Sequence, residues 1–127
     1  MAHRFKIHYT VEQARTLLPQ VRQWLQGLKE HARSLQEDGD TIAKLLETGD
    51  LGGDRVNRYV RALAEFTEIV KKFREREIQI KDLDRGLLDF PAIIGGKEVF
   101  LCWEEDEDDI EFWHDLDTGY QGRERLP

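Results

Sequence analysis

The stretch GLLDFPAIIGGKEVFLCW, residues 86–103, has the alternating pattern of a β-hairpin. On both sides of Gly95-Gly96, apolar side chains recur at every second position, which is typical of strands with one buried face. Two consecutive glycines favour a two-residue turn because both of its central positions need a positive φ. Such a turn fixes which residues face one another across the hairpin. The pairs expected on one apolar face are Leu88 with Trp103, Phe90 with Leu101, and Ala92 with Val99.

A third strand is expected at residues 110–114, after an acidic turn at residues 104–109. Pairing Leu101 with Phe112 continues the apolar face of the hairpin, which then packs against a helical layer. The opposite face carries two cross-strand rows, the first with Asp89, Cys102 and Glu111 and the second with Pro91, Phe100 and Trp113. In this register Cys102 and His114 lie on opposite faces of the sheet.

Before the hairpin, two apolar stripes at three- and four-residue spacing predict two long helices. The first helix begins after Thr10, whose hydroxyl can cap it while Gln13 returns a hydrogen bond, as in a capping box. It runs to about Glu37 and stops at residues 38–40. Pro19 removes a backbone donor inside this pattern, so a kink is expected in the preceding turn.

The second stripe runs from Val56 to Leu83 and predicts a helix that ends at Gly86, a residue suited to a left-handed helix end. A turn or two of helix is expected at residues 41–47, followed by a glycine-rich hinge at residues 49–53. Two long helices joined by such a connection are expected to pack as an antiparallel hairpin.

These elements predict a single α+β domain over residues 1–127. Residues 10–85 would form a long antiparallel helical hairpin, and residues 86–127 a small antiparallel β-meander with a polar tail. A chain of this length can bury a substantial core, and its recurring apolar residues argue against disorder.

The composition argues against several classes of protein. The net charge is −7 and the pI is near 5.1, whereas nucleic-acid binding needs a basic surface that neutralises phosphates. No apolar stretch approaches the roughly 20 residues that cross a bilayer, and the N-terminus lacks the apolar core of a signal peptide. The single cysteine agrees with a reducing compartment. We therefore expect a cytoplasmic protein without nucleic-acid or membrane partners.

Three groups of motifs carry a family resemblance. They are YTVEQA followed by LLP at residues 9–19, GLLDFP at residues 86–91, and LCW at residues 101–103 with FWH at 112–114 and GYQGR at 119–123. With these motifs the chain resembles a family of small uncharacterised bacterial proteins, a domain of unknown function. The resemblance covers nearly the whole chain and implies a bacterial cytoplasmic protein, and it carries over no site residue.

Side chains capable of metal binding gather in the last third of the chain. The candidates are Asp89, Cys102, Glu111 and His114. Carboxylates can hold a hard divalent cation, but the expected register separates the thiol from the imidazole, and a tetrahedral site needs converging ligands. We therefore favour structural roles over metal binding for three of these residues. Asp89 would accept backbone hydrogen bonds, Cys102 would be a small buried side chain, and His114 would be a hydrogen-bonded ring. No cofactor is predicted, and a divalent metal is the one candidate.

The tail adds polar residues that could line a pocket. The candidate lining residues are Asp89, Glu111, His114, Asp117 and Arg123. The alternative is that Arg123 pairs with Asp115 or Asp117 and pins the tail to the sheet.

The second sheet face would leave an aromatic patch in water unless something covers it. The candidate interface residues are Pro91, Ile93, Phe100, Trp113 and Tyr120. A second copy of the chain could cover this patch, since two-fold pairing needs only one self-complementary surface; the N-terminal arm or the tail could do so equally well. No complete catalytic set is present. We therefore expect a noncatalytic interaction or assembly module that uses this sheet face and the helical surface, either as a homo-oligomer or as a partner of another protein. The alternative is a small metal-binding protein or enzyme that uses the carboxylates and His114.

Overall fold

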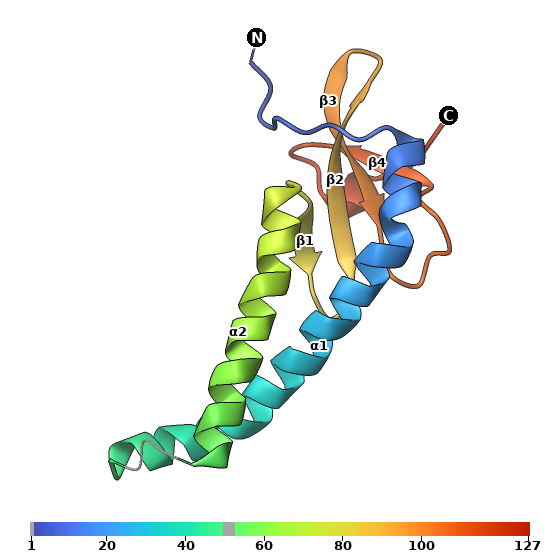
Figure 1. The fold of residues 1–127 in the computed structure, drawn as a ribbon. Helices are drawn as coiled ribbons and strands as arrows, with labels where there is room; N and C mark the ends of the chain where they lie inside the picture. Colours follow the sequence, from blue (N-terminus) through green and yellow to red (C-terminus); the bar gives the residue numbers. More distant parts are fainter. Residues whose placement is uncertain (1, 50–52) are drawn as a thin grey trace.

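A computed structural model describes residues 2–49 and 53–127 and confirms the α+β fold (Figure 1). Two helices form a hairpin, and a sheet packs at the end where the hairpin opens. The elements are α1 Val11–Glu47, α2 Asp54–Glu75, β1 Gln79–Asp82, β2 Leu87–Ile94, β3 Lys97–Trp103, β4 Phe112–Asp115, the short 3-10 helix η1 Tyr120–Gly122, and β5 Glu124–Arg125. Of the predicted hinge, residues 50–52 lie outside the described residues.

Helix α1 begins where the sequence predicts and ends later. The Thr10 hydroxyl accepts the Gln13 N–H and the Gln13 side chain accepts the Thr10 N–H, both at 3.0 Å, so the capping box is confirmed. The predicted stop at residues 38–40 is wrong, because α1 continues to Glu47. A glycine inside a helix costs only about 1 kcal/mol, and burial of Ile42 one turn later offsets that cost. The helix also continues through Pro19, whose side chain is exposed.

Helix α2 ends at Glu75, well before the predicted stop at Gly86. The chain reverses at Glu77, which has a φ of +57°. The Ile78 N–H donates to the Phe73 carbonyl at 3.1 Å, and the Glu77 N–H donates to the Arg74 carbonyl at 3.0 Å. This is the Schellman arrangement that ends many helices, here with glutamate where glycine is usual.

After this helix end the chain forms a strand that the sequence analysis missed. β1 contains Ile80, which the apolar spacing predicts to lie in the second helix. Gly86, with a φ of +64°, lies in the turn between β1 and β2 rather than at a helix end. An added Cβ there would approach the Glu105 Cβ to 2.5 Å, so the position favours glycine for two reasons.

The sheet is an antiparallel meander in the order β1-β2-β3-β4-β5. The predicted register between β2 and β3 is confirmed, with Leu88 opposite Trp103 and Asp89 opposite Cys102. The predicted register between β3 and β4 is wrong by one residue: Phe112 lies opposite Cys102 instead of Leu101. β4 begins at Phe112 instead of residue 110, so the connection between the two strands is longer than predicted. Ile110 lies in this connection and is fully buried.

The one-residue shift exchanges the two faces of β4, because successive side chains point to opposite sides of a strand. Trp113 pairs with Leu101 and packs against the core on the helix side. His114 pairs with Phe100 and therefore shares the outer face of the sheet with Cys102. The expectation that Cys102 and His114 lie on opposite faces is wrong for this reason.

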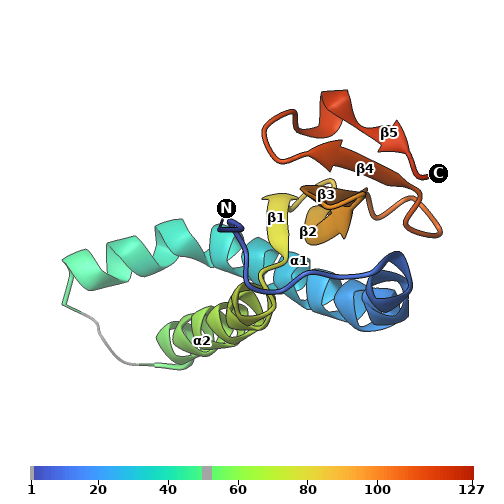
Figure 2. The ribbon, with the colours of Figure 1, turned by 90° about the horizontal axis from the view of Figure 1, so that it is seen from above.

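The helices cover one face of the sheet (Figure 2). The core between the two layers is built from side chains that are almost fully buried, among them Leu25 and Leu28 of α1, Phe73 of α2, and Leu88, Phe90, Leu101 and Trp103 of the sheet. The opposite, outer face of the sheet is not covered by the helices, and the segment before α1 packs on part of it.

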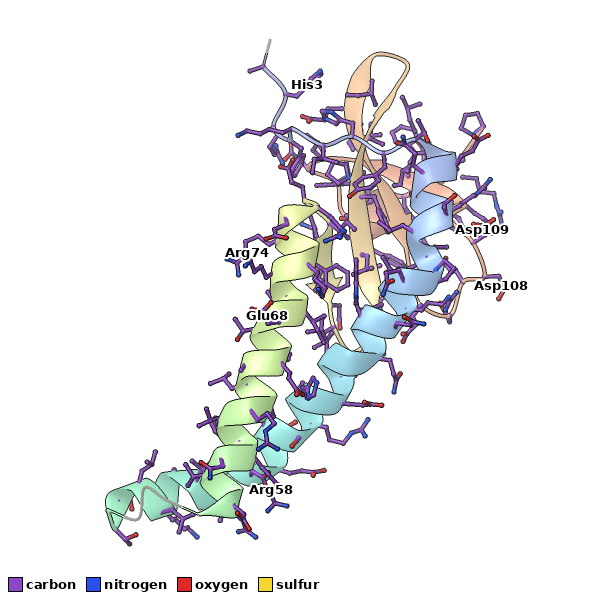
Figure 3. All side chains as sticks on the ribbon, viewed as in Figure 1. His3, Arg58, Glu68, Arg74, Asp108 and Asp109 are labelled. Atoms are coloured by element: carbon purple, nitrogen blue, oxygen red, sulfur yellow. The ribbon has the colours of Figure 1, made fainter. Side chains whose placement is uncertain are left out.

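The acidic turn before β4 is bound to α1. Arg22 donates to the carbonyls of Glu105 and Glu107 at 2.9 and 2.8 Å, and Lys29 Nζ lies 2.6 Å from Glu105 Oε1. Figure 3 shows Asp108 and Asp109 on this loop beside the first turns of α1. Basic residues of α1 therefore hold the acidic loop in place. No helix among the described residues is long and apolar enough to span a membrane.

Candidate functional site

The N-terminal arm, residues 2–9, crosses the sheet end and is held by two carboxylates. Glu98 accepts the backbone N–H groups of Arg4 and Phe5 at 2.7 and 3.0 Å, and its Oε2 lies 2.7 Å from His8 Nε2. The Glu77 carboxylate accepts two further N–H groups, those of Lys6 and Ile7, at 2.8 and 2.7 Å.

The arm covers part of the aromatic patch that the sequence predicts on the outer face. The Phe5 ring lies 5.3 Å from the Phe100 ring, measured between centroids. Pro91 and Phe100 are buried, and Trp113 has moved to the helix side, so these three residues do not form an exposed patch. The other two interface candidates are more accessible: Ile93 is 39% exposed, and Tyr120 is half-buried.

Beside the covered patch, three different metal-ligating side chains meet on the outer face. They are Asp89 of β2, Cys102 of β3 and His114 of β4, and their ligand atoms lie within 4.8 Å of one another. Asp89 and His114 are each 2% exposed and Cys102 is fully buried. We call these three residues the buried Asp–Cys–His group. It combines three of the four weak metal candidates of the sequence analysis.

Both ring nitrogens of His114 have a partner. Nδ1 lies 2.6 Å from the Asp115 carbonyl oxygen, which can only accept, so Nδ1 carries a proton. Nε2 lies 3.0 Å from Asp89 Oδ1. Burial opposes the charged ring, but hydrogen bonds with Asp89, Cys102 and the Asp115 carbonyl outweigh it and raise the pKa of His114 to about 10. Without a metal, His114 and Asp89 therefore form a buried imidazolium–carboxylate pair.

Arg123 closes the group from the tail. Its Nη1 lies 3.9 Å from Cys102 Sγ and donates to Glu107 Oε1 at 3.2 Å. The guanidinium also stacks on the rings of Phe112 and Tyr120, at 3.9 and 4.4 Å from their centroids. Arg123 thus pins the tail through Glu107, and not through the predicted partners Asp115 or Asp117.

A cavity of about 280 Å³ lies over the buried Asp–Cys–His group. Its lining residues are Lys81, Leu87, Asp89, Cys102, His114, Leu116, Asp117, Gly119 and Tyr120. All three members of the group face it. It contains Asp89, His114 and Asp117 of the predicted polar pocket, whereas Glu111 is about half exposed and pairs with Arg125 at 3.8 Å.

Lys81 and the apolar walls of this cavity are not predicted by the sequence pattern. Lys81 was hidden because residues 79–82 continue the apolar spacing of α2, so they were assigned to a helix. Leu87 is the first residue of β2 and Leu116 directly follows β4, and nothing in the sequence marks either side chain as part of a cavity wall. No glycine stands between Val56 and Gly86, so the sequence does not show that α2 ends at Glu75 with Glu77 in the left-handed conformation. Lys81 is therefore not recognisable as a strand residue from the sequence.

A second cluster of possible ligands lies at the arm, where His3, His8 and Glu98 approach one another within 4.8 Å. His3 is exposed (Figure 3), and both oxygens of Glu98 already accept hydrogen bonds from the arm. The buried Asp–Cys–His group is therefore the stronger candidate site.

The arm should detach in acid. Burial opposes the charge of Glu98, but hydrogen bonds from His8 and from the N–H groups of Arg4 and Phe5 outweigh it and lower the pKa of Glu98 from 4.5 to about 2. A lowered pKa stabilises the docked arm above pH 4.5, and this contribution is lost as the pH falls toward 2. We expect the Arg4 and Phe5 amide resonances to shift over that range. A Glu98→Gln variant whose arm amides shift identically over the same range would contradict this role.

The fold and the site thus define a small α+β protein with a buried mixed-donor group under a cavity on the outer face of a β-meander. The family comparison agrees with the resemblance drawn from the motifs. A family model described as an uncharacterized conserved protein, DUF2203, matches residues 7–126, and the chain belongs to this family. The comparisons with curated proteins and with solved structures return no match.

Proposed function

We propose that this protein binds one divalent transition-metal ion through Asp89, Cys102 and His114. The observation that supports the proposal is the convergence of carboxylate, thiol and imidazole donor atoms within 4.8 Å in a buried setting. This convergence favours a metal-binding protein over a noncatalytic assembly module.

The donor set selects a class of metal. Sulfur and nitrogen ligands suit zinc and neighbouring transition metals, whereas calcium and magnesium prefer oxygen ligands throughout. The hydrogen bond from Nδ1 to the Asp115 carbonyl leaves Nε2 as the metal-binding atom of His114. Such a bond to the second nitrogen is what orients most metal-ligating histidines. The ion would take the place of the proton that Nε2 otherwise carries.

The number of ligands indicates the type of centre. Structural zinc sites use four protein ligands, whereas catalytic sites use three and keep the fourth position for water or substrate. The buried Asp–Cys–His group supplies three ligands and faces a cavity. We therefore propose an open centre, of the type that can exchange a ligand.

Self-association of the chain stays a prediction. The structure does not single out one surface for it among the described residues. The outer sheet face is partly covered by the arm. The large apolar side chains that remain most exposed in the described chain lie on the helical hairpin, for example Val60 at 57% and Leu46 at 51%.

Metal titration of untagged protein tests the proposal. We expect one equivalent of Zn²⁺ or Co²⁺ per chain. The variants Cys102→Ser and His114→Gln should weaken binding more than about a hundredfold, since even groups that only orient a ligand cost ten- to a hundredfold. Glu111→Ala is the matched control and should bind as the wild type does. A wild-type protein that takes up no ion, or a Cys102→Ser variant with unchanged affinity, would rule out this centre.

A further inference from the structure

The cavity over the buried Asp–Cys–His group points to a specific class of ligand. We propose that it binds a small monoanionic carboxylate, with the carboxylate group on the metal and Lys81 beside it. This inference rests on the proposed function, because the metal ion is the anchor of the ligand. It adds the chemical class of the molecule that occupies the fourth position of the centre.

The position of the cavity gives the ligand access to the metal. Asp89, Cys102 and His114 all line the cavity, so an ion held by them presents its remaining coordination position to that space. The opposite sides of the group are closed: Arg123 lies against Cys102, and the Phe100 ring lies 5.5 Å from the His114 ring. A fourth ligand would therefore approach from the cavity.

The charge of the site favours an anion. A divalent ion bound by the Asp89 carboxylate and the Cys102 thiolate is formally neutral, with His114 as a neutral ligand. Lys81 then adds one positive charge at the cavity wall. Within residues 2–49 and 53–127, Lys81 forms no salt bridge, and its ammonium lies 5.3 Å from the Phe100 ring centroid. The other acid in the lining, Asp117, is paired with Arg4 at 3.2 Å.

The walls and the size of the cavity describe the rest of the ligand. Leu87 and Leu116 provide apolar surface. Tyr120 provides an aromatic ring, and the guanidinium carbons of Arg85 and Arg123 lie 4.5 and 4.4 Å from its centroid. A volume of about 280 Å³ lies just below the range of typical drug-sized pockets. The cavity therefore suits a short carboxylate with an apolar or aromatic body.

Cobalt-loaded protein allows the metal and the ligand to be followed separately. The thiolate-to-cobalt absorption band reports metal binding, and the visible bands of the ion report a change in its fourth ligand. We expect benzoate to shift the visible bands in a saturable way at low ionic strength, while benzamide, its neutral counterpart, does not. Lys81→Gln should weaken benzoate binding about five- to tenfold and leave cobalt affinity unchanged. Lys44→Gln, at the far end of α1, is the control and should behave as the wild type does.

The outcomes separate the two claims. A wild-type protein without the thiolate-to-cobalt band would overturn the proposed function itself. A cobalt protein whose visible bands ignore both benzoate and acetate would overturn the carboxylate inference and leave the metal centre intact. Equal benzoate affinity in the wild type and in Lys81→Gln, or an equal response to benzamide, would overturn the electrostatic basis of the inference.

Discussion

Replacing Asp89 with alanine is expected to destabilise the metal-free protein by about 3–5 kcal/mol, the typical cost of breaking a buried ion pair. Asp89 and His114 are each 2% exposed, and 3.0 Å separates Asp89 Oδ1 from His114 Nε2. Alanine would leave the buried imidazole without its carboxylate partner. Loss on this scale is a large part of the 5–15 kcal/mol that stabilises an ordinary domain.

Urea unfolding in the presence of a chelator measures this effect. The control is Glu111→Ala, because Glu111 is an acidic residue near the same strands with a side chain 51% exposed. An exposed substitution of this kind should change the free energy of unfolding by less than about 0.5 kcal/mol. Equal midpoints for Asp89→Ala and Glu111→Ala would show that Asp89 is not a buried partner of His114.

Replacing Trp103 with alanine should also cost about 3–5 kcal/mol, the range measured for truncation of large buried aromatic residues. Trp103 is fully buried, and its Nε1–H donates to the Glu107 carbonyl at 3.0 Å. The Arg22 guanidinium lies 4.8 Å from the ring centroid on the α1 side. The substitution would therefore open a cavity between the layers and remove one of the hydrogen bonds that hold the acidic loop.

The matched control for this truncation is Val60→Ala on α2, where the side chain is 57% exposed. We expect the control to unfold within about 0.5 kcal/mol of the wild type. A cost below 1 kcal/mol for Trp103→Ala would contradict the packing of β3 against α1.

The hairpin at residues 86–103 was predictable because its determinants are local. Gly95 and Gly96 have φ values of +59° and +79°, as the two-residue turn requires. Strict alternation of side chains then fixes the register between β2 and β3. The capping box at Thr10 was predictable for the same reason, since both of its hydrogen bonds lie within one turn of helix.

The remaining parts of the fold depend on contacts that a local pattern does not contain. The register of β4 is set by a loop that Arg22 and Lys29 of α1 hold in place from far along the chain. The end of α2 is set by a left-handed glutamate whose carboxylate also binds the arm. Neither feature has a signature in the neighbouring residues.

The candidate site shows how much one register error can matter. Each member of the buried Asp–Cys–His group is a metal candidate in the sequence. The predicted register of β4 differs by one residue from the observed one, and it places His114 on the face opposite Cys102. With the observed pairing of His114 to Phe100, the three donor atoms converge. Lys81 could not be placed at all, because its strand was assigned to a helix.

The most direct measurement of the proposed centre is the X-ray absorption spectrum of the protein loaded with one equivalent of zinc. The account predicts one sulfur neighbour at about 2.3 Å and nitrogen and oxygen neighbours at about 2.0–2.2 Å. The sulfur contribution should disappear in Cys102→Ser and persist in Glu111→Ala. A first shell made only of nitrogen and oxygen in the wild-type protein would contradict a metal centre built on Asp89, Cys102 and His114.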